Sequence, residues 1–384
     1  MEYEVLNSIR IGIVGGGQLA KMMAASAMKF GFSIFILEKV KNTPCENLAT
    51  EILYGDWDDP SNLLKLANKV DIVTLENEFV DAKSLSFLEK NSYKLFPYSK
   101  TIALVQDKLV QKKVLNDAGI SVAPFAKIES KNDIILEAKK LGWPIILKKR
   151  RNGYDGKGNA TIHDKKDIDA AWDKLDGENQ ELYVESFCNF SSELAVMITR
   201  STNGEIATYP IVESIQKNHI CHKVKAPADI NKITASKALE LSIKAVETID
   251  GVGSFGIEMF YKDNEIILNE MAPRVHNSGH YTIEACQCSQ FENHIRAILG
   301  LPLGSTKMIA PAAVMVNILG DKNGSGYPNG IEDAFKIDNA HIHIYGKKTS
   351  TIGRKMGHVT ALGSTINEAE KTANLAASLI HFGE

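Results

Sequence analysis

The sequence predicts a protein of the α/β and α+β classes, with a Rossmann-like parallel-sheet domain first and a small β-rich domain last. Residues 9–38 follow a strand, helix, strand order around a glycine turn, which is typical of a βαβ unit with parallel strands. Residues 254–270 have the pattern of an antiparallel hairpin, and short strands dominate after about residue 302. For 384 residues we expect two to three domains, with bounds at 1–98, 99–305 and 306–384.

The first domain alternates apolar runs with a helix. Gly15-Gly16-Gly17-Gln18 opens the helix, its apolar positions recur at helical spacing, and Gly31 ends it. Glu76 and Glu78 follow the last strand of this domain, at the end where ligands of open α/β sheets lie. The expected strands are 10–14, 33–37 and 70–75.

The second domain begins after a break near Phe96-Pro97-Tyr98. Helical spacing predicts helices at 101–118, 235–249 and about 282–299. The hairpin is expected to pair 254–261 with 265–270 around Lys262-Asp263-Asn264. Further strands are expected at 143–148, 182–184, 194–199, 313–318, 341–345 and 358–362.

Composition excludes several classes of protein. A net charge of −3 gives no basic field for nucleic acid, so we expect no nucleic-acid partner. No apolar run reaches the roughly 20 residues of a membrane helix, and the acidic start lacks the features of a signal peptide. Five cysteines without a CxxC pattern are expected to be reduced thiols. We therefore expect a cytoplasmic protein with no membrane contact.

The first glycine turn leaves two interpretations open. Gly15 to Ala20 fits a G-x-G-x-x-A pattern, and Glu38 ends the next strand, which together would suit a dinucleotide. A helix that begins after glycines also accepts other phosphates, including that of a nucleoside monophosphate.

A second glycine-rich loop, Gly153 to Asn159, follows a buried strand that ends in four basic residues, Lys148 to Arg151. Glycines allow backbone amides to surround an anion, and Lys148 and Lys157 would add charge. The alternative is a flexible surface turn with solvated lysines.

The hairpin carries two glutamates on one face. If Tyr261 pairs with Glu265, then Glu258 lies opposite Leu268 and Glu270 is its diagonal neighbour. Two carboxylates beside a polyphosphate suit Mg²⁺. The alternative is an exposed hairpin with solvated glutamates.

The loop Pro273 to His280, which follows Asn269 and Glu270, collects Arg, His and Asn side chains that a packed core rarely needs. His276 and His280 are four residues apart, but Pro273 and Gly279 disfavour the helix that a zinc site would require. We expect these side chains to hydrogen-bond a substrate. Lys347, Arg354 and Lys355 flank a turn in the last domain, where a solvated basic hairpin is the alternative.

The chain resembles a known family in motifs that run in order along nearly its whole length: GGGQLAKM, TLENEFV, LKKRRNGYDGKGN, YVESFCNFSSE, SFGIEMF, NEMAPRVHNSGHYTIEACQCSQFENHIRAILGLPL and GRKMGH. The family is that of the N5-carboxyaminoimidazole ribonucleotide synthetases. This resemblance implies an ATP-grasp fold and the carboxylation of 5-aminoimidazole ribonucleotide with ATP and bicarbonate, in purine synthesis. It also implies Mg²⁺, a homodimer, and a product passed to a separate mutase.

The resemblance also implies the nucleotide site. Lys108 and Lys148 would hold the phosphates beneath the glycine loop, the segment after the strand at 182 would line the adenine, and Glu193 would meet the ribose. The implied ATP-binding residues are Lys108, Lys148, Gly153, Tyr154, Asp155, Gly156, Lys157, Gly158, Asn159, Glu185, Ser186, Phe187, Cys188, Glu193, Gln216, Asn269 and Glu270.

The same resemblance implies Glu258 and Glu270 as metal ligands, and Arg274, His276, Lys157 and Asp155 as catalytic residues. The implied substrate-binding residues are Gly17, Gln18, Leu19, Glu76, Tyr154, Asp155, Arg274, His276, Asn277, Lys347 and Arg354.

Some positions depart from the family pattern. Ala20-Lys21 replaces a common Gly-Arg, Asn159 stands where Gln is usual, and Gln216 stands where a nucleotide-contacting His is frequent, a role that His219 could also fill. Alternatives to the carboxylase are a formate-dependent glycinamide ribonucleotide transformylase, an NAD-dependent oxidoreductase and an inactive ATP-binding regulator. The opening GGGQLAK, the loop GYDGKGN and the paired glutamates favour the carboxylase.

Overall fold

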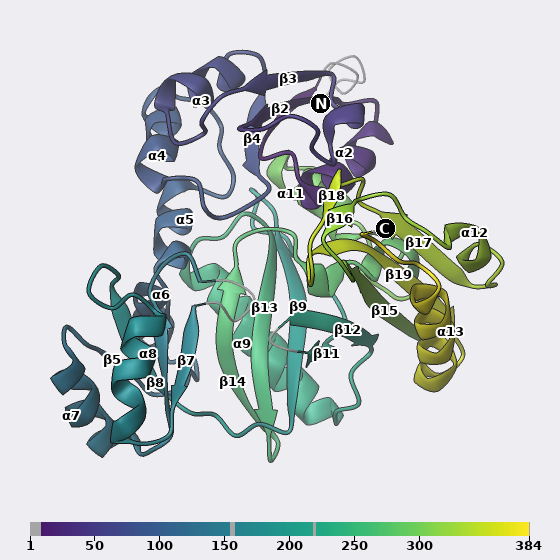
Figure 1. Ribbon diagram of the computed structural model, residues 1–384. Helices are drawn as coiled ribbons and strands as arrows, with labels where there is room; N and C mark the ends of the chain where they lie inside the picture. Colours follow the sequence, from purple (N-terminus) through teal and green to yellow (C-terminus); the bar gives the residue numbers. More distant parts are fainter. Residues whose placement is uncertain (1–8, 154–157, 218–219, 384) are drawn as a thin grey trace.

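Four parallel strands form the first sheet of the computed structural model, which describes residues 9–153, 158–217 and 220–383 (Figure 1). The predicted βαβ unit is confirmed, because β1 and β2 pair in parallel and α2 lies between them in the chain. The strand order is β3-β2-β1-β4. Its elements are β1 (Arg10–Val14), α2 (Gln18–Met28), β2 (Ser33–Glu38), η1 (Glu46–Leu48), β3 (Glu51–Tyr54), α3 (Pro60–Ala67), β4 (Ile72–Leu75) and α4 (Ala82–Lys90).

A small antiparallel sheet of four strands, ordered β5-β8-β6-β7, follows two short helices. In Figure 1 it forms the lower left lobe with α7 and α8 against it. Its apolar core includes Trp172, Leu147 and Val184. The elements are α5 (Ser99–Gln106), α6 (Lys108–Asp117), β5 (Phe125–Lys127), α7 (Lys131–Leu141), β6 (Ile145–Lys149), β7 (Asn159–Ile162), η2 (Lys165–Asp167), α8 (Ile168–Lys174) and β8 (Leu182–Ser186).

A nine-stranded sheet forms the centre of the molecule, in the order β14-β13-β9-β11-β12-β15-β19-β17, with β10 paired to β9. Sequence analysis assigned no strands to β10, β11 and β12. The central elements are β9 (Ser192–Arg200), β10 (Ile206–Thr208), β11 (Val212–Lys217), β12 (Ile220–Ala226), α9 (Lys232–Thr248), β13 (Gly253–Lys262), β14 (Glu265–Ala272), η3 (Asn277–Gly279), α10 (Thr282–Ala285) and α11 (Gln290–Ile298).

The C-terminal strands continue this same sheet, because β15 pairs with β12 over Ala313–Val316. The β-rich C-terminal part therefore shares backbone hydrogen bonds with the central part. A two-stranded sheet, β16-β18, accompanies it. The elements are β15 (Ala312–Leu319), β16 (Gly324–Ser325), α12 (Ile331–Ala334), β17 (Ala340–Ile344), β18 (Thr349–Ser350), β19 (Lys355–Gly363) and α13 (Ile366–Ser378).

Two predicted helices are wrong as single elements. The helix expected at 101–118 is divided into α5 and α6 at Asp107, whose carboxylate accepts hydrogen bonds from the amides of Leu109 and Val110. This side chain caps a new helix start and so ends the preceding helix. The helix expected at 282–299 is likewise interrupted between α10 and α11, where Ser289 caps the second part.

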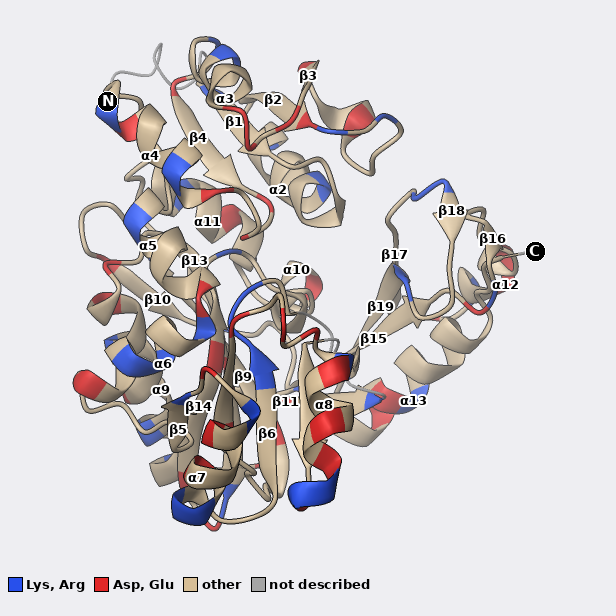
Figure 2. Cartoon of the chain, turned by 60° about the vertical axis from the view of Figure 1, so that its left-hand side comes forward, with Lys and Arg blue, Asp and Glu red and all other residues tan. Residues whose placement is uncertain are grey.

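The parallel sheet packs onto the centre through α2 and α11. Leu19, Met22 and Met23 belong to the same apolar cluster as Phe291 and Ile295. Basic and acidic residues are interspersed over all parts of the chain (Figure 2). Within the described residues, the helices are too short or too polar to cross a membrane.

Asp107 also holds the start of the glycine loop. Its carboxylate accepts hydrogen bonds from Arg150 at 3.1 Å (Nε) and 2.6 Å (Nη2), and it is 2% exposed. We expect Asp107→Ala to lower the free energy of unfolding by about 3 kcal/mol, because it removes a helix cap and a buried ion pair. Urea unfolding followed by circular dichroism measures the change. Asp117→Ala, at the exposed end of α6, is the control, and equal effects of the two variants would contradict this role.

Candidate functional site

The hairpin of β13 and β14 brings Glu258 directly opposite Glu270, although the predicted register is wrong. Lys262 pairs with Glu265 around a two-residue turn, in which Asp263 and Asn264 have positive φ angles of 50° and 65°. The register then shifts by one residue after Glu258, with an extra residue on β14. The turn shifts the pairing by one residue from the expected register and the bulge shifts it by another, so that Glu270 moves from the expected diagonal position to the directly paired one.

The two carboxylates are electrostatically linked. Burial, together with the charges of Glu270 and Glu193, raises the pKa of Glu258 to about 8. Burial also raises the pKa of Glu270, but the charge and hydrogen bond of Lys108 outweigh it, so that this pKa is lowered overall. At neutral pH the pair therefore retains one proton in the absence of a cation.

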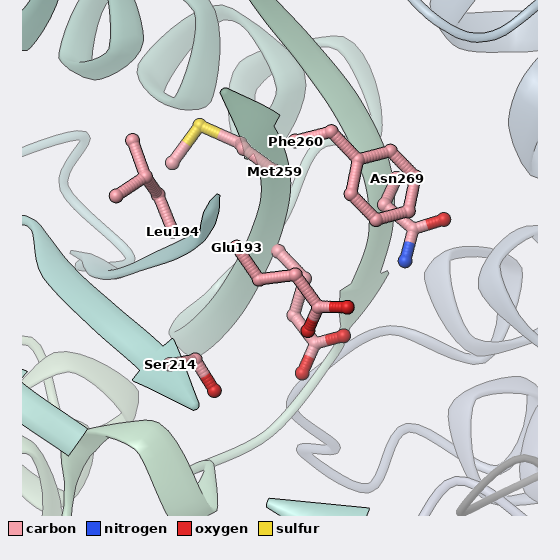
Figure 3. A pocket seen from close by; sticks show the side chains of 7 residues that line it. Glu193, Leu194, Ser214, Met259, Phe260 and Asn269 are labelled. Atoms are coloured by element: carbon pink, nitrogen blue, oxygen red, sulfur yellow. The ribbon is translucent and has the colours of Figure 1, made fainter. Parts of the chain in front are cut away.

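The oxygens around this pair fit a hard divalent cation. Asn269 lies beside the glutamates on β14, and its Oδ1 is buried without a hydrogen-bond partner. Glu193, Ser214 and Asn269 line a hollow next to Glu258 (Figure 3). Carboxylate and amide oxygens are ligands that Mg²⁺ accepts. Among the described residues, no group of three or more His, Cys, Asp or Glu side chains could hold a metal, so the zinc interpretation has no support there.

The basic residues at the end of β6 have different partners, so that Lys148 belongs to the site and Arg150 stabilises the chain around it. Lys148 turns toward Glu185, with its Nζ 2.9 Å from Oε2, and is 8% exposed. Arg150 instead binds Asp107 and Glu181 and so fixes the chain. Lys108 begins α6 next to Asp107 and pairs with Glu270. Lys108 and Lys148 therefore each pair with a carboxylate of the site, Glu270 and Glu185 respectively.

The glycine-rich loop is described only at its two ends. A Cβ atom at Gly158 would lie 2.7 Å from the Cα of Gly153, so the ends approach as closely as glycines permit. Asn159 begins β7 opposite Lys148. The predicted site residues Tyr154, Asp155, Gly156 and Lys157 lie outside the described residues.

The segment expected to line an adenine begins at the end of β8. The side chain of Glu185 is buried and binds Lys148, Lys112 and Tyr183. The backbone amides of Ser186 and Phe187 donate to Pro124 and Pro144, at 2.8 Å and 3.3 Å. The Phe187 ring is exposed, and Cys188 is half-buried.

Glu193 occupies the start of β9, across from Phe260 of β13. Burial raises its pKa, and a hydrogen bond from Gln216 opposes that rise. The Gln216 amide also donates to Ser214 Oγ at 3.0 Å. Gln216 thus lies next to the carboxylate expected at the ribose, while His219 is outside the described residues.

The first glycine turn uses its amides on the protein itself. Gly16 donates to Glu38 at 2.7 Å, and Leu19 donates to Glu76 at 3.3 Å. A Cβ at Gly17 would collide with the Glu76 carboxylate, which explains the glycine there. Because Glu38 caps its own loop, the dinucleotide interpretation loses the acid that would bind a ribose. Gln18 is the first residue of α2, and the next residue, Leu19, is the one that donates to Glu76.

Arg274 is held by Glu78, which sequence analysis placed at the ligand end of the first sheet but did not include among the site residues. Its guanidinium forms a bidentate ion pair with Glu78, in which Nη2 lies 3.0 Å from Oε1. Its Nη1 also donates to the carbonyl of Val275 at 3.1 Å. The pairing of a buried Arg with the loop after β4 joins the parallel sheet to the hairpin.

His276 and Asn277 are fixed by buried amides from two other elements. Gln290 of α11 accepts a hydrogen bond from His276 N at 2.8 Å and donates to His276 O at 2.7 Å. Asn277 and Asn317 exchange hydrogen bonds at 3.0 Å and 2.7 Å. Burial, followed by the charge of Arg274, lowers the pKa of His276 to about 3, so the imidazole is neutral. Its Nε2 lies 3.7 Å from Glu258.

The basic residues at the start of β19 and in the loop before it donate hydrogen bonds to backbone carbonyls of the same region. Lys347 donates to the carbonyl of Lys355 at 2.7 Å, and Arg354 donates to the carbonyl of Thr349 at 2.8 Å. Sequence analysis noted Lys355 in this basic group but gave it no role in the site. Its charge opposes the rise of the Glu258 pKa and adds to the lowering of the His276 pKa. Lys355 is the first residue of β19 and follows Arg354, and this position in the sequence was the signal that could have placed it in the site. Lys21 ties α2 to the end of β17 by donating to the Ile344 carbonyl at 2.9 Å.

Three family models match the chain in order. They are the ribonucleotide synthetase preATP-grasp domain at residues 8–106, the ATP-grasp domain at 113–291 and the phosphoribosylaminoimidazole carboxylase C-terminal domain at 313–372. The Bacillus subtilis N5-carboxyaminoimidazole ribonucleotide synthase is 40% identical over 351 residues, which are 91% of this chain and 90% of that protein.

Solved structures agree with these matches. The Thermotoga maritima N5-carboxyaminoimidazole ribonucleotide synthetase has a TM-score of 0.88 at 39% identity, over 98% of this chain and 100% of the other. An Aspergillus clavatus N5-carboxyaminoimidazole synthase, in complex with ADP and 5-aminoimidazole ribonucleotide, has a TM-score of 0.89 at 34% identity, over 97% and 99% of the chains.

The Glu258 pKa predicts a pH-dependent stability. Its folded value of about 8 lies above the unfolded value of roughly 4.3, so the folded state binds the extra proton and stability falls as pH rises through this window. Without divalent cations, Glu258→Gln should therefore raise the melting temperature relative to the parent at pH 8.5, and less so at pH 5. Differential scanning calorimetry at both pH values measures this. Glu265→Gln, at the exposed start of the paired strand β14, should change neither value, and a uniform effect of Glu258→Gln at both pH values would refute the assignment.

Proposed function

Because the chain belongs to the N5-carboxyaminoimidazole ribonucleotide synthetase family, we propose that it carboxylates the exocyclic amine of 5-aminoimidazole ribonucleotide with ATP and bicarbonate, in purine biosynthesis. A bicarbonate oxygen takes the γ-phosphoryl group of ATP, which gives carboxyphosphate and ADP. The amine nitrogen then forms a bond to the carboxyl carbon, phosphate leaves, and the amine loses a proton. The observation that carries the proposal is Glu258 opposite Glu270 with Lys108 beside them.

The nucleotide belongs between the small and the large antiparallel sheets. Lys108 and Lys148 meet the phosphates, with Gly153 to Asn159 above them, and cations here neutralise the charge that gathers on the transferred oxygens. Glu185 to Cys188 line the adenine, and Glu193 with Gln216 meets the ribose. The hydrogen bond of Gln216 to Glu193 supports Gln216 as the residue that replaces the usual His.

Glu258 and Glu270, with Asn269 next to them, are the proposed Mg²⁺ ligands. Bound Mg²⁺ would neutralise charge on the polyphosphate and orient it for transfer. The raised pKa of Glu258 supports this role, because a directly paired set of half-buried carboxylates favours a compensating cation.

The ribonucleotide and the carboxylation chemistry belong between the parallel sheet and the C-terminal strands. Gly17, Gln18, Leu19, Lys347 and Arg354 are the proposed contacts of its phosphate. Glu76, Tyr154, Asp155, Arg274, His276 and Asn277 are the proposed contacts of the imidazole and the bicarbonate-derived group.

Arg274 and His276 are the proposed catalytic residues among those described, with Asp155 and Lys157 from the glycine loop. Arg274 stays charged, and its ion pair with Glu78 fixes the direction in which its remaining N–H groups point. The neutral His276 supplies a hydrogen bond without adding charge. Exclusion of water by the surrounding residues would protect carboxyphosphate from hydrolysis.

The finer expectations of sequence analysis remain proposals. They are the bicarbonate substrate, a homodimer, transfer of the product to a separate mutase, a cytoplasmic location, and domain bounds at 1–98, 99–305 and 306–384. The three family models match in the same order as the proposed domains, at 8–106, 113–291 and 313–372, and the first range extends beyond residue 98.

ADP release tests the proposed reaction. We expect turnover with ATP, Mg²⁺, bicarbonate and 5-aminoimidazole ribonucleotide, and none with glycinamide ribonucleotide plus formate, because the site carboxylates and cations suit carboxyphosphate chemistry. A coupled assay measures ADP, and chromatography identifies the carboxylated ribonucleotide. Turnover that requires formate would replace the proposal with the transformylase.

Glu270→Gln tests the metal assignment. We expect kcat to fall by at least about 100-fold, because the proposed Mg²⁺ loses one charged oxygen ligand and no longer neutralises the reacting phosphates as well. Glu265→Gln on the same strand is the matched control. Near-parental ADP production by Glu270→Gln would show that Mg²⁺ binds elsewhere.

A further inference from the structure

A lysine other than Lys108 and Lys148 lies behind the proposed nucleotide site. Lys112 of α6 is 2% exposed, and its Nζ lies 3.3 Å from Oε1 of Glu185. The other oxygen of Glu185 binds Lys148 at 2.9 Å, and the Tyr183 hydroxyl donates to Oε1 at 2.7 Å. One buried carboxylate is therefore shared by two lysines that come from a helix and a strand.

Lys112 makes this ion pair without the alignment of a hydrogen bond, so its ammonium donors are unsatisfied among the described residues. A buried ammonium is costly unless a charge compensates it. With all three groups ionised, Lys112, Glu185 and Lys148 carry a net charge of +1. This charge lies beside the segment Glu185 to Cys188, the proposed lining of the adenine.

We propose that Lys112 is a positioning residue for ATP, which acts through Glu185 to leave Lys148 available to the nucleotide. The proposal rests on the nucleotide site of the proposed function. Without Lys112, Glu185 would pair with Lys148 alone, and the two charges would cancel. With Lys112 present, Glu185 is divided between two cations, and a positive charge remains for the polyphosphate.

The cluster also predicts how ATP binding responds to pH. Burial, opposed by the charge of Glu185, lowers the pKa of Lys112 to about 8. Lys112 is therefore charged at neutral pH and loses its proton as pH rises through 8, which would weaken ATP binding. The titratable and charged groups around it are Tyr183, Glu185, Cys188, Lys148, Glu270 and, one helical turn away, Lys108.

Three variants separate charge from structure. Lys112→Met removes the charge, Lys112→Arg retains a charge that does not titrate near pH 8, and Lys113→Met, at the exposed neighbouring position, is the matched control. For each, KM for ATP and for 5-aminoimidazole ribonucleotide is measured at pH 7, and kcat/KM for ATP from pH 6.5 to 9. Calorimetric titration with Mg-ADP, without the ribonucleotide, measures nucleotide binding independently of turnover.

We expect Lys112→Met to raise KM for ATP and Kd for Mg-ADP by about tenfold, with less than about a twofold change in KM for the ribonucleotide. The alkaline fall in kcat/KM for ATP should disappear in Lys112→Arg. Equal losses for both substrates, a Lys112→Met variant that matches Lys113→Met, or an alkaline fall that persists in Lys112→Arg would overturn the proposal. If Lys112→Met does not fold, Lys112→Arg still decides it.

These results are distinguishable from a failure of the proposed reaction. If the parent binds Mg-ADP but does not turn over 5-aminoimidazole ribonucleotide, the proposed reaction is wrong. The calorimetric comparison of the variants then still tests the role of Lys112 in nucleotide binding.

Discussion

The repulsion between Glu258 and Glu270 is the constraint on which the rest of the site depends. Two carboxylates at one cross-strand pair are unfavourable unless a proton or a cation lies with them. Lys108 meets this need on one side, and the position of Lys108 depends in turn on the new helix start at Asp107. The carboxylate of Asp107 also holds Arg150 and thereby the base of the glycine loop. A chain of charge pairs therefore connects the hairpin to the loop.

The remaining side of the site depends on neutral hydrogen bonds. Gln290 fixes the backbone of His276, and Asn317 fixes the amide of Asn277. Gln290 and Asn317 are both buried, and their hydrogen bonds restrain the loop between β14 and α10. Arg274 in the same loop takes its direction from Glu78 of the parallel sheet. Three separate parts of the chain thus determine the geometry of four consecutive residues.

Sequence patterns predicted the βαβ unit, the hairpin and most C-terminal strands, because each has a clear apolar period. They did not predict the bulge at Glu258, since an extra residue in a strand changes no local propensity. The division at Asp107 had a signal, an acid at a helix start, but the apolar period continues across it. The hairpin pattern selected Glu258 and Glu270 as a cation site, and motif resemblance added the catalytic role of Arg274.

Partners that come from distant segments could not be predicted in this way. Glu78, Gln290 and Asn317 act on residues 196, 14 and 40 positions away, and no spacing rule relates such pairs. Glu185 shows a related limit, because resemblance assigned its backbone to adenine while its carboxylate binds Lys112 and Lys148. A role carried by a motif does not reveal what the side chain contacts.

The pairing of β12 with β15 determines what a fragment of this enzyme without its C-terminal strands would expose. Both strands have a second neighbour, β11 and β19, so neither is at a free margin of the large sheet. A fragment that ended before β15 would expose the unpaired amides and carbonyls of Lys223–Ala226 to solvent or to another molecule. An unpaired sheet edge of this kind can pair with the same edge of another copy. The C-terminal segment therefore protects the central part from self-assembly as well as contributing to its site.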